Sequence, residues 1–421
     1  MTTTTIHLIT FFQSIASLID STHAQFRGQH LKSAYICARL AKVLKISPAD
    51  ALNLVLASLV RDIGTLTLRE RLTIQSISSQ KTQQHCTVAY WILNQDSDLS
   101  PIAQIILYHR HPFTHEFAGD VDAKIQQLSQ ILHIADRMAC AINPDQLAVL
   151  SASPVLSMVA ENSGQLFNPE LCSAIQTLGN NEAFWLDMDL SNISRALALH
   201  LPDDAPVDLN YFERIALVFR YFIDFRSEFT IAHTAGVTAI AEKLAEMAHF
   251  SAEDIQKIRI AAYLHDIGKY AVPAEILEKP VALSSEEFEV VRATPYYTYW
   301  CLAGLGHEIQ TWSGHHHERL NGSGYPFGIK GDAIELGAQI IGLADMFSAM
   351  IERRPYRDGK TSTEALQILQ NDAEQGKISA DLLGIAKANE SELAAYHAQK
   401  IDEAFDVYNE YIKSLMYAQS K

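Results

Sequence analysis

Apolar residues recur along most of the chain at the three- and four-residue spacing of an amphipathic helix. Residues 31–44 and 235–247 show this spacing clearly, with apolar positions on one face and charged residues elsewhere. Segments in which apolar and polar residues alternate, the pattern of a half-buried strand, are scarce. The pattern therefore predicts an all-α fold.

The helical pattern is interrupted near the middle of the chain. Residues 201–208 hold two prolines and three aspartates, a composition typical of a linker. Four short segments before this break resemble four after it, in the same order and at a slowly growing offset. We therefore predict two tandem copies of one helical domain, over residues 1–200 and 201–421. The matched segments are 59–65 with 263–269, 85–93 with 294–302, 134–136 with 343–345, and 164–171 with 376–383.

The 421 residues carry 33 basic and 49 acidic side chains, which gives a formal net charge of −16. Such a surface repels polyanions, so we expect no long nucleic acid among the partners. Five scattered cysteines without a CxxC pair indicate reduced thiols, and the chain begins without a basic leader segment. No apolar stretch reaches membrane-spanning length. These features predict a cytoplasmic protein with no membrane partner.

The second half contains several residues of the types that bind metal ions. Imidazole and carboxylate groups together suit iron, manganese, zinc or nickel. Each residue alone has an ordinary structural explanation, since a single histidine is usually a surface or core residue. Burying an unpaired carboxylate in an apolar helical run is costly, however, so Asp345 and the full set favour a metal site. The candidates are His233, His265 with Asp266, the histidines at 315–317, and Asp345.

Two strings in the second half resemble those of a known family. Residues 265–269 read His-Asp-Ile-Gly-Lys, and residues 316–326 read His-His-Glu-Arg-Leu-Asn-Gly-Ser-Gly-Tyr-Pro. Together they closely resemble the HD-GYP subgroup of the HD-domain phosphohydrolases, and the flanks at 279–289 and 354–357 agree as well. The resemblance covers roughly residues 211–383. It implies an all-helical fold with a metal centre that hydrolyses cyclic dinucleotides, usually cyclic di-GMP.

The resemblance also implies roles for individual residues. Two divalent transition metals, iron, manganese or nickel, would bind, and Asp266 would bridge them. Lys269 would contact the scissile phosphate and, with Asp266, take part in catalysis. The matched metal ligands are His233, His265, Asp266 and Asp345 for one ion, and Asp266, His316 and His317 for the other. The residues matched to substrate binding are Lys269, Gly322, Gly324, Tyr325, Pro326 and Arg354.

One ligand position departs from the family pattern. The family places a histidine before a proline between the two strings, and here that position is Thr294. A neutral hydroxyl is a poor ligand for these metals, so the second ion would bind more weakly or complete its shell with water. Whether His315 or His307 takes this place stays open. Phe229 stands where some members carry a glutamate associated with a third metal, so we expect no third ion.

The first half keeps only part of the ligand set. Arg61 replaces His265, and a fixed cation at a ligand position opposes metal binding. Thr65 replaces Lys269, residues 108–112 stand in place of the paired histidines, and no GYP string follows. We predict a non-catalytic module for regulation, ligand sensing or dimerisation, with a decayed duplicate kept for packing as the alternative. The retained ligand types are His30, Asp62 and Asp136, with His85 opposite Thr294.

These observations support three functional hypotheses. The first is metal-dependent hydrolysis of a 3′–5′ phosphodiester of a cyclic dinucleotide, cyclic di-GMP before others, to a linear dinucleotide. The second is the same chemistry on 3′3′-cyclic GMP-AMP. The third is a signalling protein that binds a cyclic dinucleotide or a partner without cleavage, although the intact Lys269 and GYP string argue against a pure scaffold. Residues 1–200 would provide a homodimer contact or the site for a signalling partner.

Overall fold

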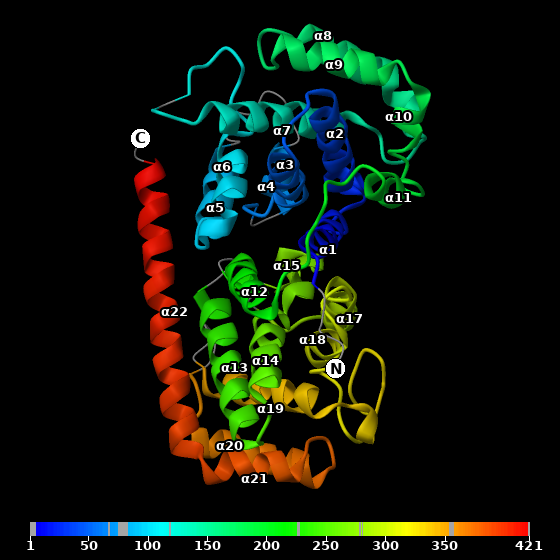
Figure 1. Ribbon diagram of the computed structural model, residues 1–421. Coiled ribbons are helices and arrows are strands. Elements are labelled where there is room, and N and C mark those ends of the chain that lie inside the picture. The colour runs from blue at the N-terminus through cyan, green and yellow to red at the C-terminus, as the bar shows by residue number, and fades with distance from the viewer. Residues whose placement is uncertain are drawn as a thin grey trace. The chain divides into compact units, whose positions relative to one another are not determined.

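The computed structural model describes residues 6–65, 68–74, 83–117, 119–224, 228–277, 279, 281–352 and 358–419. Nearly all regular structure in these ranges is helical (Figure 1). Strand pairing within them is limited to two isolated bridges, Ile6 with Val207 and Ser163 with Phe167. The predicted all-α fold is therefore confirmed.

The chain divides into two compact units between Pro206 and Val207. The division falls inside the proline- and aspartate-rich segment, slightly beyond residue 200. Residues 7–206 form the N-terminal unit and residues 207–421 form the C-terminal unit. Ile6 belongs with the C-terminal unit, because the N–H of Val207 donates to its carbonyl oxygen at 2.9 Å.

The helices of the N-terminal unit are α1 (Leu8–Asp20), α2 (Gln29–Val43), α3 (Pro48–Val60), α4 (Leu68–Ile74), α5 (Gln83–Leu93), α6 (Ser100–Tyr108), α7 (Ala123–Ala141), α8 (Ala152–Glu161), α9 (Pro169–Gly179), α10 (Glu182–Leu186) and α11 (Ile193–Ala198). Short 3-10 turns cover Ala24–Phe26, Ser97–Leu99 and Ala148–Ser151. Helix α2 is central and packs against α1, α3 and α7. Helix α6 packs against α3, α5 and α7.

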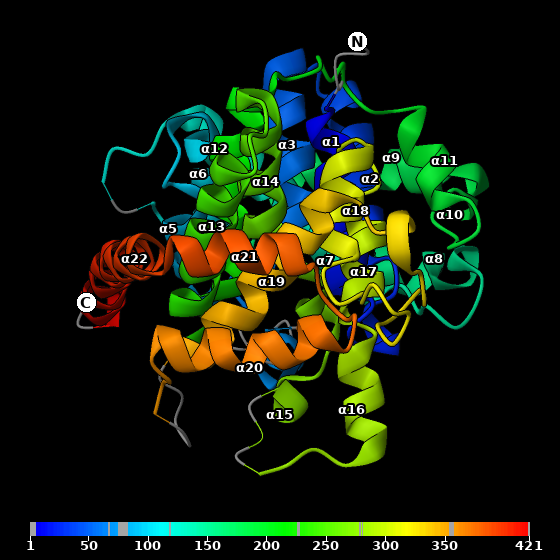
Figure 2. The same cartoon turned by 90° about the horizontal axis from the view of Figure 1, so that it is seen from below.

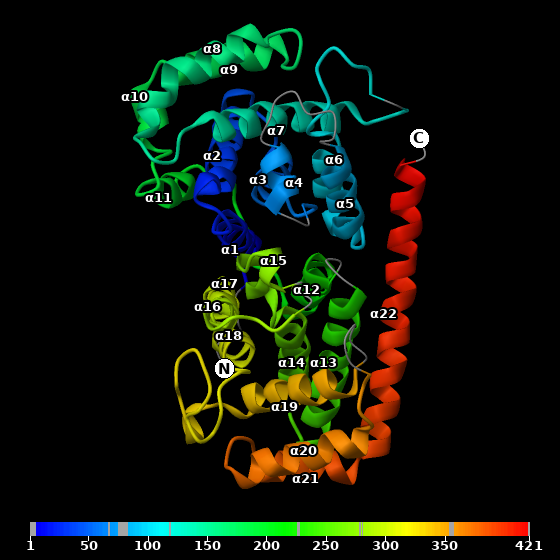
Figure 3. The same cartoon turned by 180° about the vertical axis from the view of Figure 1, so that it is seen from behind.

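The helices of the C-terminal unit are α12 (Leu209–Asp224), α13 (Glu228–Met247), α14 (Ala252–Leu264), α15 (Ala274–Leu277), α16 (Ser285–Arg292), α17 (Thr294–Cys301), α18 (His307–Gly314), α19 (Leu336–Ile351), α20 (Ser362–Glu374), α21 (Ala380–Ala388) and α22 (Glu390–Gln419). Short 3-10 turns cover Ile267–Ala271 and Gly331–Ala333. Helix α13 is central and packs against α14, α19 and α22, with α19 crossing α13 and α14 (Figure 3). Helices α20 and α21 lie beside each other at one end (Figure 2).

Helix α13 differs from its predicted form in two respects. It begins at Glu228, so His233 lies inside the helix and not at its start. Residues 233–241 are buried without interruption, because α14, α19 and α22 surround the helix. Polar side chains tolerate this burial through local bonds: the hydroxyl of Thr234 donates to Asp224 at 2.6 Å, and that of Thr238 to the carbonyl oxygen of Thr234 at 2.8 Å.

The two units share the same turn between two helices, from α2 to α3 in one unit and from α13 to α14 in the other. Lys45 and His249 both adopt a positive φ, 53° and 60°, at equivalent places after α2 and α13. The next helix then starts with a serine cap: Ser47 accepts from the N–H of Asp50 at 3.2 Å, and Ser251 accepts from that of Asp254 at 3.1 Å. The same local chemistry therefore positions α3 and α14, as expected for two copies of one domain.

The five cysteines form no disulfide, and all but Cys140 are buried. Burial raises the pKa of the Cys37, Cys86 and Cys301 thiols to about 12, so these thiols are protonated at neutral pH. Within the ranges that the structure describes, no helix combines the length and the apolar character needed to cross a membrane.

Candidate metal centre

The C-terminal unit brings together the six residues predicted as metal ligands. They come from α13, from the end of α14, from the segment after α18, and from α19. Their ligand atoms form three overlapping groups, and within each group all atoms lie within 4.8 Å of one another. Histidine and carboxylate atoms at such separations can share one ion. The groups are His233, His265 and Asp345; His265, Asp266 and His316; and His316, His317 and Asp345.

His265 and His316 are held in the same orientation. The Nδ1 atom of His265 is hydrogen-bonded to the carbonyl oxygen of Ala262 at 2.8 Å, and that of His316 to the carbonyl oxygen of Ser313. Because a carbonyl oxygen only accepts, each Nδ1 carries the proton and each Nε2 keeps its lone pair. Both Nε2 atoms are buried without a hydrogen-bond partner among the described residues. Such orphaned nitrogens are costly, so these two residues fit a metal ion.

His233 is oriented by two residues that the sequence motifs did not identify. Its Nδ1 lies 3.2 Å from Oε2 of Glu352, and its Nε2 lies 3.2 Å from Oδ1 of Asp345. His397 of α22 places its Nε2 3.8 Å from Oε1 of Glu352. Gly236 makes room for this contact, since a Cβ there would lie 2.4 Å from that nitrogen. The buried Glu352 and His397 therefore fix the ring of His233 from behind.

The two carboxylates of the groups are ionised. Burial alone would raise the pKa of Asp266, but Lys269 and His265 hold it well below its usual range. Burial would likewise raise the pKa of Asp345, but the hydrogen bond to His233 and the neighbouring His317 and His316 together hold it well below its usual range. Burial lowers the pKa of His317 to about 4, so this imidazole is neutral at pH 7. Ionised carboxylates beside neutral imidazoles make an attractive site for a divalent cation.

Lys269 and His233 carry positive charge at this site. Lys269 pairs with Asp266 through Nζ and Oδ2 and remains partly exposed. Burial lowers the pKa of His233, but Glu352 and Asp345 raise it to about 10. In the absence of a cation the ring therefore holds a proton between two carboxylates, and binding of a metal at Nε2 would release that proton.

The loop 322–326, here called the GYP loop, is attached to the paired histidines through Glu318. The Oε1 atom of Glu318 accepts a hydrogen bond from the N–H of Phe327 at 2.7 Å. Gly324 packs so closely on this segment that a Cβ would lie 2.4 Å from Cα of Glu318. Gly322 has a φ of +82°, which favours glycine. Backbone geometry thus explains both glycines of the motif.

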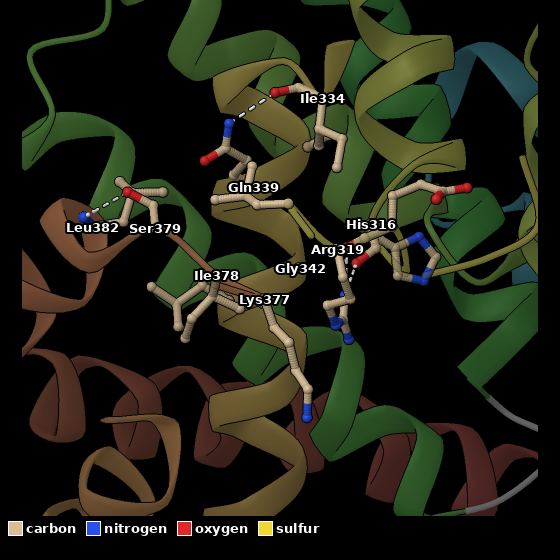
Figure 4. Close-up of a pocket in the computed structure, with 13 residues that line it drawn as sticks. His316, Arg319, Ile334, Gln339, Gly342, Lys377, Ile378, Ser379 and Leu382 are labelled. Carbon is tan, nitrogen blue, oxygen red and sulfur yellow. Dashed lines mark hydrogen bonds between the residues drawn. The ribbon is translucent and has the colours of Figure 1, made fainter. Parts of the chain in front are cut away.

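The backbone of the paired histidines is also fixed from behind. Arg319 donates from Nη1 to the carbonyl oxygen of His316 at 3.0 Å, as Figure 4 shows. Gly342 of α19 lies against the same carbonyl group, and a Cβ there would be 2.5 Å from the oxygen. The cavity on this side has a volume of about 20 Å³, which is room for about one water molecule. It is therefore too small for a nucleotide.

Tyr325 lies between His317 and the guanidinium group of Arg292. Its ring centroid is 4.9 Å from that of His317, and the guanidinium of Arg292 lies 4.9 Å from the Tyr325 centroid. The aromatic ring and the positive charge thus stand beside His317, a member of one ligand group. Pro326 follows in the same loop, whereas Arg354 lies outside the described residues.

Thr294 is not replaced as a ligand by either of the two histidines considered for this role. Its Oγ1 is buried and lacks a hydrogen-bond partner in the part of the chain that the structure describes. His315 stacks on Tyr299 with centroids 5.4 Å apart and an interplanar angle of 6°. His307 is bonded to Glu335 at 2.6 Å on the surface. Neither belongs to a ligand group.

The N-terminal unit shows where a histidine at this position would point. His85, the equivalent of Thr294, places Nε2 4.0 Å from Oδ1 of Asp62. The backbones correspond as well: a Cβ on Gly64 would lie 2.0 Å from the carbonyl oxygen of His85, and one on Gly268 2.2 Å from that of Thr294. Because the backbones correspond, a histidine at position 294 would be directed at Asp266 as His85 is directed at Asp62.

We expect Thr294→His to strengthen metal binding, because the new imidazole would reach Asp266. A restored ligand should raise the affinity for Mn²⁺ by about tenfold or more, measured by isothermal titration calorimetry on the whole chain. Thr294→Val keeps the shape but offers no ligand, so it should bind Mn²⁺ as the wild type does. Equal affinity in all three proteins would contradict the assignment of this position to the second site.

In the N-terminal unit, arginines surround the aspartate that corresponds to Asp345. Asp136 accepts hydrogen bonds from Arg61 at 2.7 Å and from Arg137 at 2.6 Å, and Nη2 of Arg110 lies 3.0 Å from it. Arg61 and Arg110 stand at the positions of His265 and His317 in the other unit. Fixed guanidinium groups thus occupy the places of metal ligands and balance the carboxylate themselves.

A further group of potential ligands in the N-terminal unit, His85, Cys86 and His109, does not fit a cation. The Nδ1 of His109 is bonded to the carbonyl oxygen of Ile106 at 2.7 Å, the bond that orients His316 in the other unit. Its Nε2, however, accepts from the Nε–H of Arg110 at 3.1 Å. Both ring nitrogens are therefore engaged, and a positive charge adjoins the group.

Comparisons with known proteins agree with this picture of two related units. A family model described as an HD domain matches residues 13–171 and residues 218–382. A 3′3′-cGAMP-specific phosphodiesterase 1 of Vibrio cholerae is 27% identical over 90% of this chain and 90% of its own. The cyclic di-GMP phosphodiesterase response regulator RpfG of Xanthomonas campestris is 38% identical over 37% of this chain and 42% of its own.

A solved structure supports the fold. The crystal structure of a cyclic GMP-AMP phosphodiesterase of V. cholerae, V-cGAP3, superposes with a TM-score of 0.62 at 22% identity and covers 93% of this chain and 98% of that one. The family resemblance predicted from the motifs is therefore confirmed. With one family match in each unit, the chain belongs to the HD domain family.

Proposed function

We propose that the C-terminal unit hydrolyses a 3′–5′ phosphodiester bond of a cyclic dinucleotide and releases a linear dinucleotide. The observation that carries this proposal is the convergence of three ligand groups with two orphaned imidazole nitrogens beside Lys269. Relatives named as cyclic dinucleotide phosphodiesterases, one of them matching 90% of this chain, support it. That relative is named as specific for 3′3′-cGAMP, which favours this substrate over cyclic di-GMP.

Two divalent transition metals, iron, manganese or nickel, would be held by the residues of the ligand groups. When bound, they would lower the pKa of water and offset negative charge on the phosphoryl oxygens. By the family resemblance, His233, His265, Asp266 and Asp345 would hold one ion, and Asp266, His316 and His317 the other. In the structure the ligand atoms of His316 and His317 group with Asp345, and that of Asp266 groups with His265 and His316.

The chain's own residues would then bind and orient the phosphodiester. Once Asp266 engages cations, the ammonium of Lys269 becomes available to a phosphoryl oxygen, where it stabilises the charge that develops during bond cleavage. The GYP loop, held by Glu318, presents Tyr325 to the same place. These positive charges at the site allow an acidic protein to accept a small anionic ring.

The experiment measures product formation by the purified whole chain loaded with Mn²⁺ or Fe²⁺. We expect 3′3′-cGAMP and cyclic di-GMP to yield linear dinucleotides on chromatography with mass detection, and removal of metal by EDTA to stop the reaction. No turnover with any of these metals would contradict the enzymatic function. Binding of the cyclic dinucleotide without turnover would instead support the non-catalytic alternative.

We further propose that the N-terminal unit is a regulatory or dimerisation module without catalysis. The arginines around Asp136 support this, because they leave no place for a metal at the equivalent of the catalytic ligands. Sedimentation of the whole chain, with and without cyclic dinucleotide, tests the dimerisation role.

A further inference from the structure

A group of aromatic side chains is exposed on α17 and beside the GYP loop, the segments that adjoin position 294 and the paired histidines. Tyr296, Tyr297 and Trp300 of α17 are 45%, 37% and 56% exposed, and Phe327, just after the GYP loop, is 36% exposed. Large aromatic side chains gathered on a surface commonly mark a binding site. Their presence therefore needs an explanation beyond the folding of the unit.

Helix α17 turns Tyr296, Tyr297 and Trp300 outward and its small or polar residues inward, while Tyr299 is half-buried. Its buried residues include Thr294, Thr298 and Cys301, which share one face. Thr298 fixes this face: its hydroxyl donates to the carbonyl oxygen of His265 at 2.9 Å and accepts from the N–H of Gly268 at 3.1 Å. This arrangement reverses the usual pattern of a surface helix, so core packing does not account for the outward aromatic residues.

The rings form one continuous surface. Phe327 lies 6.0 Å from Tyr296 and 5.0 Å from Tyr299, measured between ring centroids. Trp300 lies 6.2 Å from Tyr296 and 5.4 Å from Tyr299. We call Tyr296, Tyr299, Trp300 and Phe327 the aromatic platform. Such separations are typical of interacting aromatic side chains, so the platform is a defined surface and not a set of isolated rings.

The platform adjoins the ligand groups through three connections. Tyr299 stacks on His315, the neighbour in sequence of His316. The backbone N–H of Phe327 donates to the carboxylate of Glu318, the residue that directly follows the paired histidines. Tyr296 follows two residues after Thr294, the position at which a histidine would be directed at Asp266. The platform is therefore attached to the segments that carry the paired histidines and position 294.

We propose that the aromatic platform stacks a nucleobase of the cyclic dinucleotide and so contributes to substrate binding. The inference rests on the proposed function, because it is the substrate's phosphate that places a base here. Stacking on aromatic side chains tolerates any base, since every base has a π-face. The platform would thus serve affinity for cyclic dinucleotides as a class, while the choice between guanine and adenine would be made by other contacts.

The test compares two substrates in Trp300→Ala and Tyr296→Ala chains. For a cyclic dinucleotide we expect KM to rise about tenfold, because one stacking face is lost. The rise should be similar for 3′3′-cGAMP and cyclic di-GMP, because stacking tolerates either base, while the affinity for Mn²⁺, measured by titration calorimetry, should stay unchanged, because the metal ligands are intact. Trp300→Phe, which keeps an aromatic face, should restore most of the affinity. Phe113→Ala, which removes an exposed aromatic residue of the N-terminal unit, serves as the matched control.

Several results would overturn the inference or separate it from the proposed function. An unchanged KM for the cyclic dinucleotide in both alanine variants would contradict the platform even if the wild type is active. An altered sedimentation coefficient with unchanged KM would identify the surface as a contact between copies or with a protein partner. If the wild type turns over neither substrate, the proposed function fails, and titration calorimetry of the cyclic dinucleotide still tests the platform through a weaker Kd in Trp300→Ala.

Discussion

Asp266→Asn should lower kcat/KM for cyclic dinucleotides by on the order of 10³-fold, about 4 kcal/mol of transition-state stabilisation. Asparagine keeps the size of the side chain but removes the negative charge that faces His265 and pairs with Lys269. Without that charge, the residue shared between the two proposed ions would no longer hold them. The metal content of the purified chain, measured by mass spectrometry, should fall together with turnover.

The N-terminal unit supplies a matched control for this variant. Asp62 is equivalent to Asp266 and is equally buried, but it faces Arg61 in place of a histidine. If the N-terminal unit has no catalysis, Asp62→Asn should leave kcat/KM within about twofold and the metal content unchanged. A large loss of turnover in a folded Asp62→Asn chain would contradict the assignment of catalysis to the C-terminal unit alone.

Short sequence strings located residues of the candidate site because metal chemistry restricts both residue type and spacing. The strings at 265–269 and 316–326 contain four of the six residues that the structure brings together. His233 and Asp345 lie far from these strings; residue type and, for Asp345, the apolar run around it made them candidates, and the family resemblance assigned them to one ion. Glu352 and His397 carry no such signal, because they meet His233 only after α13, α19 and α22 have packed together.

The fold itself was predicted from apolar spacing and from the internal repeat. The spacing was a poorer guide to the limits of the central helix, because the polar residues Thr234 and Thr238 are buried inside it and satisfied locally. The repeat indicated Arg61 as a cation at a ligand position. It did not indicate that three arginines surround Asp136. Arg137 gave no signal, since it replaces a methionine, Met346, that is no metal ligand.

Asp136→Asn should destabilise the N-terminal unit by about 3–5 kcal/mol, whereas the equivalent Asp345→Asn should cost less in metal-free protein. Asp136 is fully buried and is the carboxylate that meets Arg61, Arg110 and Arg137. Neutralising it leaves buried guanidinium groups without their counter-charge, and desolvated charges of one sign repel. Urea denaturation of the whole chain, followed by circular dichroism, measures the loss.

Asp345→Asn has a different expected result because its neighbours are imidazoles. The carboxylate lies 3.2 Å from His233 and 3.7 Å from His317, and His233 keeps Glu352 as a second partner. The loss in metal-free protein should therefore be about 2 kcal/mol, the worth of one hydrogen bond between charged groups. Addition of Mn²⁺ should stabilise the wild type more than this variant, because an ion that binds only the folded state raises its stability and the variant lacks one ligand of one ion. Equal losses for the two variants in metal-free protein would contradict the view that arginines replaced metals in one unit.

The pH dependence of the Asp136 contribution distinguishes this explanation from simple loss of packing. Burial raises the pKa of Asp136, but Arg110, Arg137 and Arg61 together hold it well below its usual range. A group with a lowered folded-state pKa stabilises the protein fully above its unfolded-state pKa, about 3.9 for aspartate, and loses that effect as the pH falls toward the folded-state value. The difference in stability between wild type and Asp136→Asn should thus be constant from pH 8 to about pH 5 and shrink below pH 4. A difference that does not change down to pH 3 would indicate that shape, and not charge, makes Asp136 necessary.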